Sequence, residues 1–299
     1  MKVLCIDVGG TRIKASILKP NMKLNDLKEV KVLATRTIGW LNQSLPKIVD
    51  PNHWASFTCK ENQKAFRDFE AIAIDGPWDI RGDSICGYYP DTYNIPEKLN
   101  DQLWKTSGID NNTRKRVISH QNDAEAWLRG GLYYYKLKAE SITFPIISLI
   151  FGTGVGVSYS KDGKQLDVLN PSLVKYPNLS RYINLEHNYQ VHDYFSEKRS
   201  WSFFRSVRED NERRHWDYDR VRAEYSKRVV ALTNDIVAEK RKELKKPKMV
   251  FIGGGFSEYV SERTVSEKLG IKTKVIRSFD LDINMDLIPL LGNLDLASQ

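Results

Sequence analysis

Short apolar runs that end at a glycine recur three times along the chain. Residues 3–8 (VLCIDV) precede Gly9, residues 146–151 (IISLIF) precede Gly152, and residues 249–252 (MVFI) precede three consecutive glycines. A near-continuous apolar run of this length, bounded by a turn signal, predicts a strand buried on both faces. The three runs therefore predict three buried strands, each leading directly into a glycine turn.

The first run belongs to an opening made of strands. Apolar residues alternate at Ile13, Ala15 and Ile17, which predicts a second strand paired with the first through the glycine turn. Residues 29–36 (EVKVLATR) predict a third strand. A dinucleotide-binding or Walker phosphate loop instead requires a strand, a turn and then a helix. This order of elements therefore excludes both.

The remaining pattern alternates strands with helices. The expected elements are a strand at about 70–75, a short helix at 96–108, a strand and an amphipathic helix at 116–137 with its start at Asn122-Asp123, two strands after Pro145 with a hairpin at 161–164, a long helix at 217–246 stopped by Pro247, a strand at 273–279 and a closing helix at 285–297. Pro289 and Gly292 weaken the last of these predictions.

Composition bounds the class of protein. The chain has 299 residues, enough for two domains of ordinary size or one large one, and its 41% hydrophobic and 28% charged residues are as expected for a soluble globular protein. No apolar run approaches the ~18–20 residues of a membrane span, and Asp7 interrupts the first run too early for a signal peptide. Three cysteines without metal-ligand spacing suit a reducing compartment, so we expect a cytoplasmic protein.

A formal net charge of +8 favours anionic partners. The charge alone does not distinguish nucleotide, polyphosphate and nucleic acid. Much of the basic excess lies between Arg199 and Lys248, where a solvated helix face is the favoured explanation.

The glycine turns are candidate phosphate sites, because glycine-rich turns expose backbone N–H groups that form concave anion-binding surfaces. One such turn alone is usually structural. Three turns, each directly after an apolar strand, point to one nucleotide site. The candidate donor-binding residues are Gly9, Gly10, Thr11, Gly152, Thr153, Gly154, Gly156, Gly253, Gly254 and Gly255.

The order and spacing of these segments resemble the sugar kinase, actin and Hsp70 superfamily. Within it, "NDAEAWLRGG" at 122–131 and "IAIDGPWDIRG" at 72–82 are similar to segments of the ROK (repressor, open reading frame, kinase) family of sugar kinases. The resemblance covers most of the chain and implies an α/β fold of two ribonuclease H-like lobes, the actin-like ATPase fold. We expect lobes at residues 1–121 and 122–285, with the helix at 286–299 packing back on the first.

The resemblance also implies roles for polar residues. Asp123 would be the general base and Asn122 would hold a sugar hydroxyl, although a carboxylate here could simply cap the helix. Asp7 would contribute to a Mg²⁺ site through water, or hydrogen-bond its own turn. Lys14, or Arg12 on the same strand face, is a candidate phosphate contact, although a solvated strand face would also explain both residues.

The chain departs from the family in the acceptor region. No cysteine follows Cys86, so the zinc site of many ROK proteins is not expected. The Glu-x-Gly-His segment is degraded to residues 184–201, which leaves Glu186 and His187, with His192, as candidate sugar contacts or surface polar residues. Asp91 or Asn94 is a further sugar candidate. The layout is loosely similar to the zinc-free polyphosphate glucokinases.

These features predict an ATP-dependent kinase acting on a hexose or a derivative such as an N-acetylated hexosamine. The alternatives are a polyphosphate-dependent glucokinase and a nucleotide-binding protein with a lost or altered acceptor site. A repressor would need a DNA-binding domain before the first strand, yet that strand begins at residue 2. We therefore expect neither nucleic acid nor membrane as a partner, and the sequence leaves a homodimer open.

Overall fold

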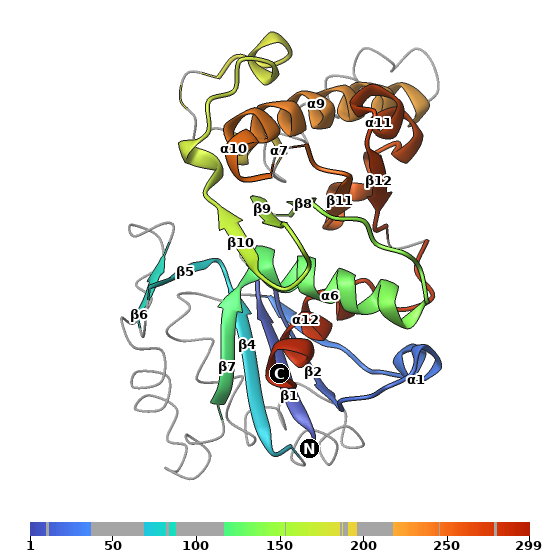
Figure 1. Cartoon of the computed structure of the whole chain (residues 1–299). Helices are drawn as coiled ribbons and strands as arrows, with labels where there is room; N and C mark the ends of the chain where they lie inside the picture. The colour runs from blue at the N-terminus through green and yellow to red at the C-terminus, as the bar shows by residue number, and fades with distance from the viewer. Residues whose placement is uncertain are drawn as a thin grey trace. The chain divides into compact units, whose positions relative to one another are not determined.

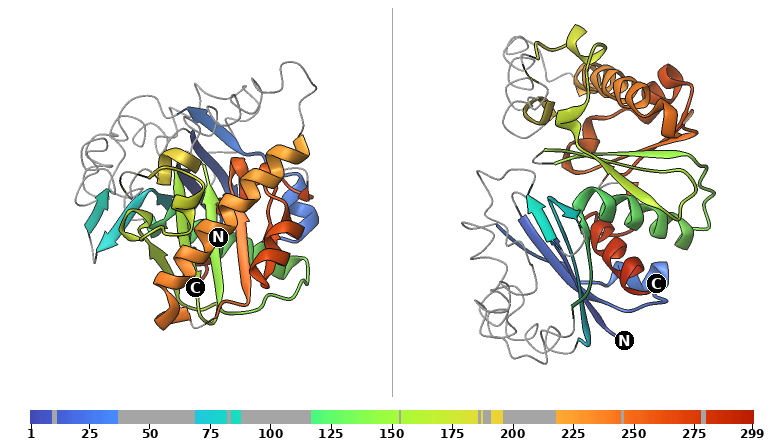
Figure 2. Two further views of the ribbon diagram at one scale, coloured as in Figure 1. Left: turned by 90° about the horizontal axis from the view of Figure 1, so that it is seen from above. Right: turned by 60° about the vertical axis from the view of Figure 1, so that its left-hand side comes forward.

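The computed structural model describes residues 1–9, 12–36, 69–81, 84–87, 117–152, 154–185, 187, 191–195, 218–244, 246–277 and 280–299. The chain forms two compact units (Figures 1 and 2). The first unit comprises Met1–Glu140 and Asp286–Gln299, and the second comprises Ser141–Met285. Each unit is described by itself below.

The first unit is built on a five-stranded mixed sheet in the order β3-β2-β1-β4-β7. Its strands are β1 (Val3–Val8), β2 (Arg12–Leu18), β3 (Leu33–Arg36), β4 (Ala71–Gly76) and β7 (Val117–Asn122). Every residue of β1 and β4 is buried, as their continuous apolar sequences predict. The first three strands are antiparallel neighbours, whereas β1, β4 and β7 run parallel and therefore end at the same edge. The expected β-β-β opening is confirmed.

Two helices pack closely against each other over this sheet. They are α6 (Asp123–Leu137) and α12 (Leu287–Ala297), coloured green and red in Figure 2. A Cβ atom on Gly130 of α6 would lie 1.7 Å from the carbonyl oxygen of Ile288, and one on Gly292 of α12 would lie 2.0 Å from that of Ala126. Both glycines thus sit where one backbone touches the other. The closing helix expected at 285–297 is therefore present, and Gly292, which had weakened that prediction, makes the close approach to α6 possible.

The division between the units falls at 140/141, whereas the sequence led us to expect 121/122. The difference is helix α6, which packs on α12 and on strands β4 and β7 of the first unit. The first unit also contains α1 (Leu24–Lys28), which the sequence analysis missed, and the small hairpin of β5 (Trp78–Arg81) and β6 (Ser84–Gly87). The helix expected at 96–108 lies outside the described residues.

The second unit, like the first, is built on a five-stranded mixed sheet, here in the order β10-β9-β8-β11-β12. Its strands are β8 (Ile146–Phe151), β9 (Val155–Ser160), β10 (Leu166–Leu169), β11 (Met249–Gly253) and β12 (Lys272–Val275). Strands β8, β11 and β12 are parallel. The long helix α9 (Tyr218–Glu239) covers this sheet through its predicted apolar stripe, of which Val221, Tyr225 and Val229 are at most 1% exposed.

Shorter elements complete the second unit. The helices are α7 (Val191–Phe195), α10 (Arg241–Leu244) and α11 (Glu262–Leu269), with 3₁₀ turns at Pro171–Leu173, Leu179–Arg181 and Gly255–Tyr259. The predicted long helix thus ends at Glu239, and α10 continues it as a separate turn. Ser261 caps the start of helix α11 with its side chain, and Gly270, in the left-handed conformation, caps its end.

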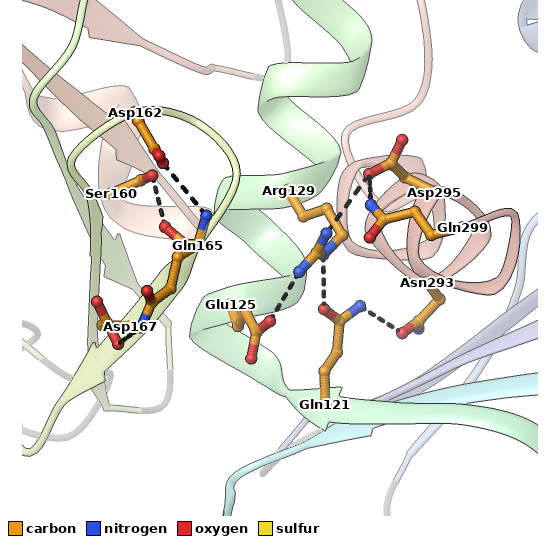
Figure 3. Close-up of polar contacts among 10 residues, drawn as sticks. All are labelled: Gln121, Glu125, Arg129, Ser160, Asp162, Gln165, Asp167, Asn293, Asp295 and Gln299. Atoms are coloured by element: carbon orange, nitrogen blue, oxygen red, sulfur yellow. Dashed lines mark hydrogen bonds and ion pairs between the residues drawn. The ribbon is translucent and has the colours of Figure 1, made fainter.

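The hairpin between β9 and β10 is fixed by its own polar side chains (Figure 3). Asp162 Oδ1 accepts from the backbone N–H groups of Lys164 and Gln165, at 2.9 and 3.3 Å. Ser160 Oγ donates to the carbonyl of Gln165 and accepts from the N–H of Gly163, which has φ +83°. The Asp-Gly pair at 162–163 therefore forms the turn expected of it.

Candidate active site

A row of polar residues crosses the sheet of the first unit where its parallel strands end. Lys14 of β2 is opposite Asp7 of β1, Asp7 is opposite Asp75 of β4, and Asp75 is opposite Gln121 of β7. Residues opposite each other on neighbouring strands point to the same face of a sheet. The row is followed directly by Asn122 and by Asp123, the first residue of α6.

Lys14 is held by two carboxylates of the first unit. Its Nζ donates to Asp7 Oδ2 at 2.8 Å and lies 3.4 Å from Asp286 Oδ1, just before α12. Burial alone would lower the pKa of Lys14, but Asp7 and Asp286 outweigh it and raise that pKa above its ordinary value. Lys14 is therefore a fixed cation beside the first glycine turn. Arg12, the alternative candidate, is exposed.

Asp75 is fully buried, and helix α12 supplies its partner. Asn293 donates from Nδ2 to Asp75 Oδ2 and to the carbonyl oxygen of Ile6, the latter at 3.0 Å. Among the described residues, Asp75 Oδ1 has no hydrogen-bond partner. Burial, followed by the charge of Asp7, raises the pKa of Asp75 well above its usual range.

The row is braced from α6 through a buried arginine (Figure 3). Gln121 donates from Nε2 to Asn293 Oδ1 at 2.9 Å and accepts from Arg129 Nε at 3.2 Å. The guanidinium also binds Glu125 at 2.9 Å and lies 3.6 Å from Asp295 of α12. A buried charge is tolerated only when it is paired and hydrogen-bonded, and Arg129 meets this condition. This network ties both helices to the sheet edge that carries the carboxylates.

At the start of α6, the helix is capped by Asn122 and not by Asp123, the expected general base. Asn122 is the N-cap, and its Oδ1 accepts from the N–H of Ala124 at 2.9 Å. Asp123 is the first helical residue and is only partly buried, although its Oδ1 also accepts from Ala124 at 2.8 Å. Since Asn122 caps the helix, the fold does not need Asp123 for this purpose.

The pKa of the Asp123 carboxyl group is shifted into the neutral range. Burial and the nearby charge of Asp7 raise the pKa of Asp123 to about 7, against the opposing effects of the Ala124 hydrogen bond and of Lys14. A carboxyl group with this pKa is divided between its two protonation states at neutral pH. Such a group can accept a proton and release it again under working conditions.

The first glycine turn is partly described. Gly9 donates its N–H to the carbonyl oxygen of Arg12 at 2.9 Å, and a Cβ on Gly9 would lie 2.9 Å from that same oxygen. Glycine is therefore required at position 9 by this close approach. Gly10 and Thr11 lie outside the described residues.

The second and third turns lie side by side at the carboxyl ends of β8 and β11. These strands are parallel neighbours, with Gly253 opposite Ile150, and a Cβ on Gly254 would lie 2.3 Å from the carbonyl oxygen of Phe151. Gly152 and Gly154 form the loop of the β8–β9 hairpin, whereas Gly156 lies within β9. Gly255 is exposed at the start of a 3₁₀ turn, and Thr153 lies outside the described residues.

Gly254 and Gly255 form a matched pair for testing this arrangement. Gly254 has φ +88° and ψ 171°, a backbone conformation that costs other residues of order 1–3 kcal/mol, in addition to the contact with Phe151. We expect Gly254→Ala to lower the free energy of unfolding of the second unit by more than about 2 kcal/mol.

Gly255→Ala is the control for stability, because an added Cβ there meets nothing within 4 Å. Urea unfolding followed by circular dichroism measures both variants. Equal stability of the two would contradict the close approach of Gly254 to Phe151.

The predicted sugar contacts are only partly visible. His187 is described and exposed, whereas Glu186, Asp91 and Asn94 lie outside the described residues. Their roles stay predictions. His192, the other histidine of this segment, contacts the second glycine turn: it accepts the N–H of Val155 on Nδ1 at 3.1 Å.

Sequence reasoning missed Asp75 and Asn293. Asp75 follows an apolar strand and precedes a glycine, which is the pattern that had drawn attention to Asp7. Asn293 is a lone amide within the apolar helix α12. An amide in such a position indicates a buried polar partner, although the sequence does not say which one.

Asp7 and Asp75 suit a cation that takes most of its ligands from water and from substrate phosphates. The described part of the chain holds no group of three or more His, Cys, Asp or Glu side chains able to enclose a metal ion. Mg²⁺ commonly keeps several waters and takes one or two carboxylates together with substrate phosphates. Asp7 lies opposite Asp75, whose Oδ1 has no partner in the part of the chain that the structure describes, and this pair fits that kind of binding.

Neither a protein-family model nor a curated protein matches the chain. Solved structures do. A ROK family glucokinase from Streptomyces griseus, in complex with glucose and AMPPNP, is 14% identical, with full coverage of both chains and a TM-score of 0.60. An inorganic polyphosphate/ATP-glucomannokinase from Arthrobacter sp. strain KM is 15% identical over 99% of this chain and 98% of its own, with a TM-score of 0.58.

Within the described ranges, no helix is long and apolar enough to cross a membrane.

A ROK family transcriptional regulator also shares the fold. It is 12% identical over 99% of this chain and 80% of its own, with a TM-score of 0.57. The resemblance inferred from the motifs is confirmed for the fold: the chain has the α/β fold of two ribonuclease H-like lobes found in ROK family proteins.

Proposed function

We propose that this protein is a kinase that transfers the γ-phosphoryl group of ATP to a hydroxyl group of a hexose or hexose derivative. The observation that carries the proposal is Asp123, a carboxylate at the start of α6 whose pKa is raised to about 7 and whose helix is already capped by Asn122. The fold is shared with a glucokinase and with a transcriptional regulator, so the fold alone does not decide the function. The raised pKa of Asp123 favours a kinase over a regulator.

Asp123 is the general base of this proposal. It takes the proton of the acceptor hydroxyl while the hydroxyl oxygen forms its bond to the γ-phosphorus, and the bond from that phosphorus to the bridging oxygen of ADP breaks. Phosphoryl transfer depends chiefly on positioning and on neutralising charge. A base whose pKa lies near the working pH supplies about 10²–10⁴-fold of rate. Asn122, adjacent to Asp123, is a proposed contact to a sugar hydroxyl.

The glycine turns are the proposed donor-binding elements. In the second unit, the neighbouring turns at 152–154 and 253–255 present backbone groups at the carboxyl ends of β8 and β11, where ligands bind in open α/β sheets. In the first unit, Gly9 and the cation of Lys14 lie at the ends of β1 and β2. Mg²⁺ bound with ATP neutralises phosphate charge, and Asp7 would hold it through water.

A substrate panel tests the proposal. Purified protein is incubated with ATP and Mg²⁺, or with polyphosphate, and with hexoses, N-acetylated hexosamines and polyols, and released ADP or shortened polymer is measured. The proposal expects ADP release that depends on one class of sugar. Nucleotide binding without turnover on any acceptor would favour a binding protein, and turnover with polyphosphate alone would reassign the donor.

A further inference from the structure

His192 lies in a segment whose polar residues were candidate sugar contacts, yet its ring contacts the second glycine turn. Val155, the first residue of β9, donates its N–H to His192 Nδ1 at 3.1 Å. The two residues are 37 positions apart, so the contact is tertiary rather than local. Both belong to the second unit.

The helix that carries His192 is anchored to the same hairpin. Val191 and Phe195, at the two ends of α7, are fully buried. The ring of Phe195 stacks on Phe151, the last residue of β8, with centroids 5.1 Å apart and planes inclined by 22°. Both rings also meet Tyr225 of α9 edge to face. The imidazole is thus presented to the turn from a fixed support.

The turn is shaped to receive the ring. Phe151 and Val155 are paired across the hairpin, and Gly152 donates its N–H to the carbonyl of Gly154 at 3.0 Å. A Cβ atom on Gly154 would lie 3.0 Å from His192 Nδ1, tighter than nearly all such contacts. Glycine at 154 therefore leaves room for the imidazole, which is a different reason from the phosphate contact expected from the sequence.

The hydrogen bond also fixes the tautomer of His192. An imidazole nitrogen that accepts an N–H carries no proton, so Nδ1 is unprotonated and the neutral ring holds its proton on Nε2. Nε2 lies 3.5 Å from Ser172 Oγ, in the 3₁₀ turn Pro171–Leu173. His192 is therefore oriented between two backbone turns.

We propose that His192 is a positioning residue for the donor: its Nδ1 holds Val155, and with it Gly152 and Gly154, in the arrangement that receives the phosphates of the nucleotide. The proposal rests on the donor-binding role given above to this turn. It assigns part of the altered segment 184–201 to the donor side of the reaction.

The test compares two replacements of His192. His192→Phe keeps a planar ring but has no acceptor, whereas His192→Asn offers its Oδ1 at the place of Nδ1. We expect His192→Phe to weaken binding of ATP with Mg²⁺, measured by calorimetry, and to raise the KM for ATP by about five- to tenfold, the loss of roughly one hydrogen bond. We expect kcat at saturating ATP to change less, and His192→Asn to recover most of the affinity.

Leu173→Ala is the matched control, because Leu173 lies in the neighbouring 3₁₀ turn and is 74% exposed. It should bind ATP as the wild type does. Exchange of the Val155 amide hydrogen, followed by NMR, reports the hydrogen bond when it is compared with the amides of β11, which follow the stability of the whole unit. In His192→Phe the Val155 amide should be accelerated more than those of β11.

The outcomes separate the two proposals. A wild type that binds neither ATP nor its analogues overturns the proposed function, and with it the donor role of His192. A wild type that binds ATP while His192→Phe binds equally well overturns the role of His192 alone. Equal loss of affinity in His192→Phe and His192→Asn would also contradict it, since the acceptor atom would then be immaterial.

Discussion

Asp123→Asn is expected to reduce kcat by about 10²–10⁴-fold, the usual contribution of a general base. The amide cannot take the proton of the acceptor hydroxyl, but it keeps an oxygen able to accept the N–H of Ala124. The fold and the cap at Asn122 should therefore survive. Steady-state kinetics measures the loss, and calorimetry with ATP should show binding close to that of the wild type.

The pH dependence of turnover gives a second reading of the same residue. Only the ionised carboxylate acts as base, so kcat should rise with pH along a limb with an apparent pKa near 7, the value to which burial and Asp7 raise the pKa of Asp123. Asp123→Asn should abolish this limb. An active Asp123→Asn variant, or a limb near pH 4, would remove Asp123 from the catalytic role.

The stability of the fold should fall as the pH rises, whereas kcat rises. The folded state raises the pKa of Asp123 above its unfolded value of about 4, so the ionised form destabilises the fold, and this loss accumulates as the pH rises from about 4 through 7. We expect Asp123→Asn to melt at a higher temperature than the wild type at pH 8. The gap should narrow at pH 5, where the folded protein holds Asp123 protonated.

Gly292→Val should unfold the first unit selectively. Even a single Cβ at this position would lie 2.0 Å from the carbonyl oxygen of Ala126, so α12 must move away from α6. In an ordinary exposed helix, replacing glycine with alanine gains up to about 1 kcal/mol. Here the contact reverses the sign, and we expect a loss of about 3 kcal/mol or more.

Hydrogen exchange measured by mass spectrometry can localise that loss. Amides of α6 and β4 should lose protection in Gly292→Val, while amides of β8 and β11 in the second unit keep theirs. The milder Gly292→Ala should show the same pattern to a smaller degree. Unchanged protection of α6 would mean that the two helices do not touch at this glycine.

Much of the fold follows from the sequence because its buried strands are so continuous. The runs at 3–8, 146–151 and 249–252 are β1, β8 and most of β11, and a glycine turn follows each of the three strands. Polar patterns over short distances were equally informative, as in the Asp-Gly hairpin and the helix start at Asn122-Asp123, although the cap is Asn122 rather than Asp123. Both kinds of signal are local, so they need no knowledge of distant residues.

The features that were missed depend on contacts between distant segments. Helix α6 has an apolar face, but the sequence does not show that α12 covers it, and the unit boundary was therefore expected about 20 residues too early. Asp75 and Asn293 are 218 positions apart, and neither is unusual until they meet. Gly154 was correctly expected in a turn, yet its neighbour His192 arrives from a separate helix.

The first unit is discontinuous, since its sheet and α6 come from residues before 141 while α12 comes from residues after 285. The second unit is contiguous and lies entirely between these two segments. On the ribosome, the second unit therefore has its whole sequence available before the first unit does. Until α12 is synthesised, Asp75 lacks Asn293, and the apolar face of α6 lacks its cover. The first unit, whose synthesis starts first, can therefore finish folding only after the second unit has been synthesised.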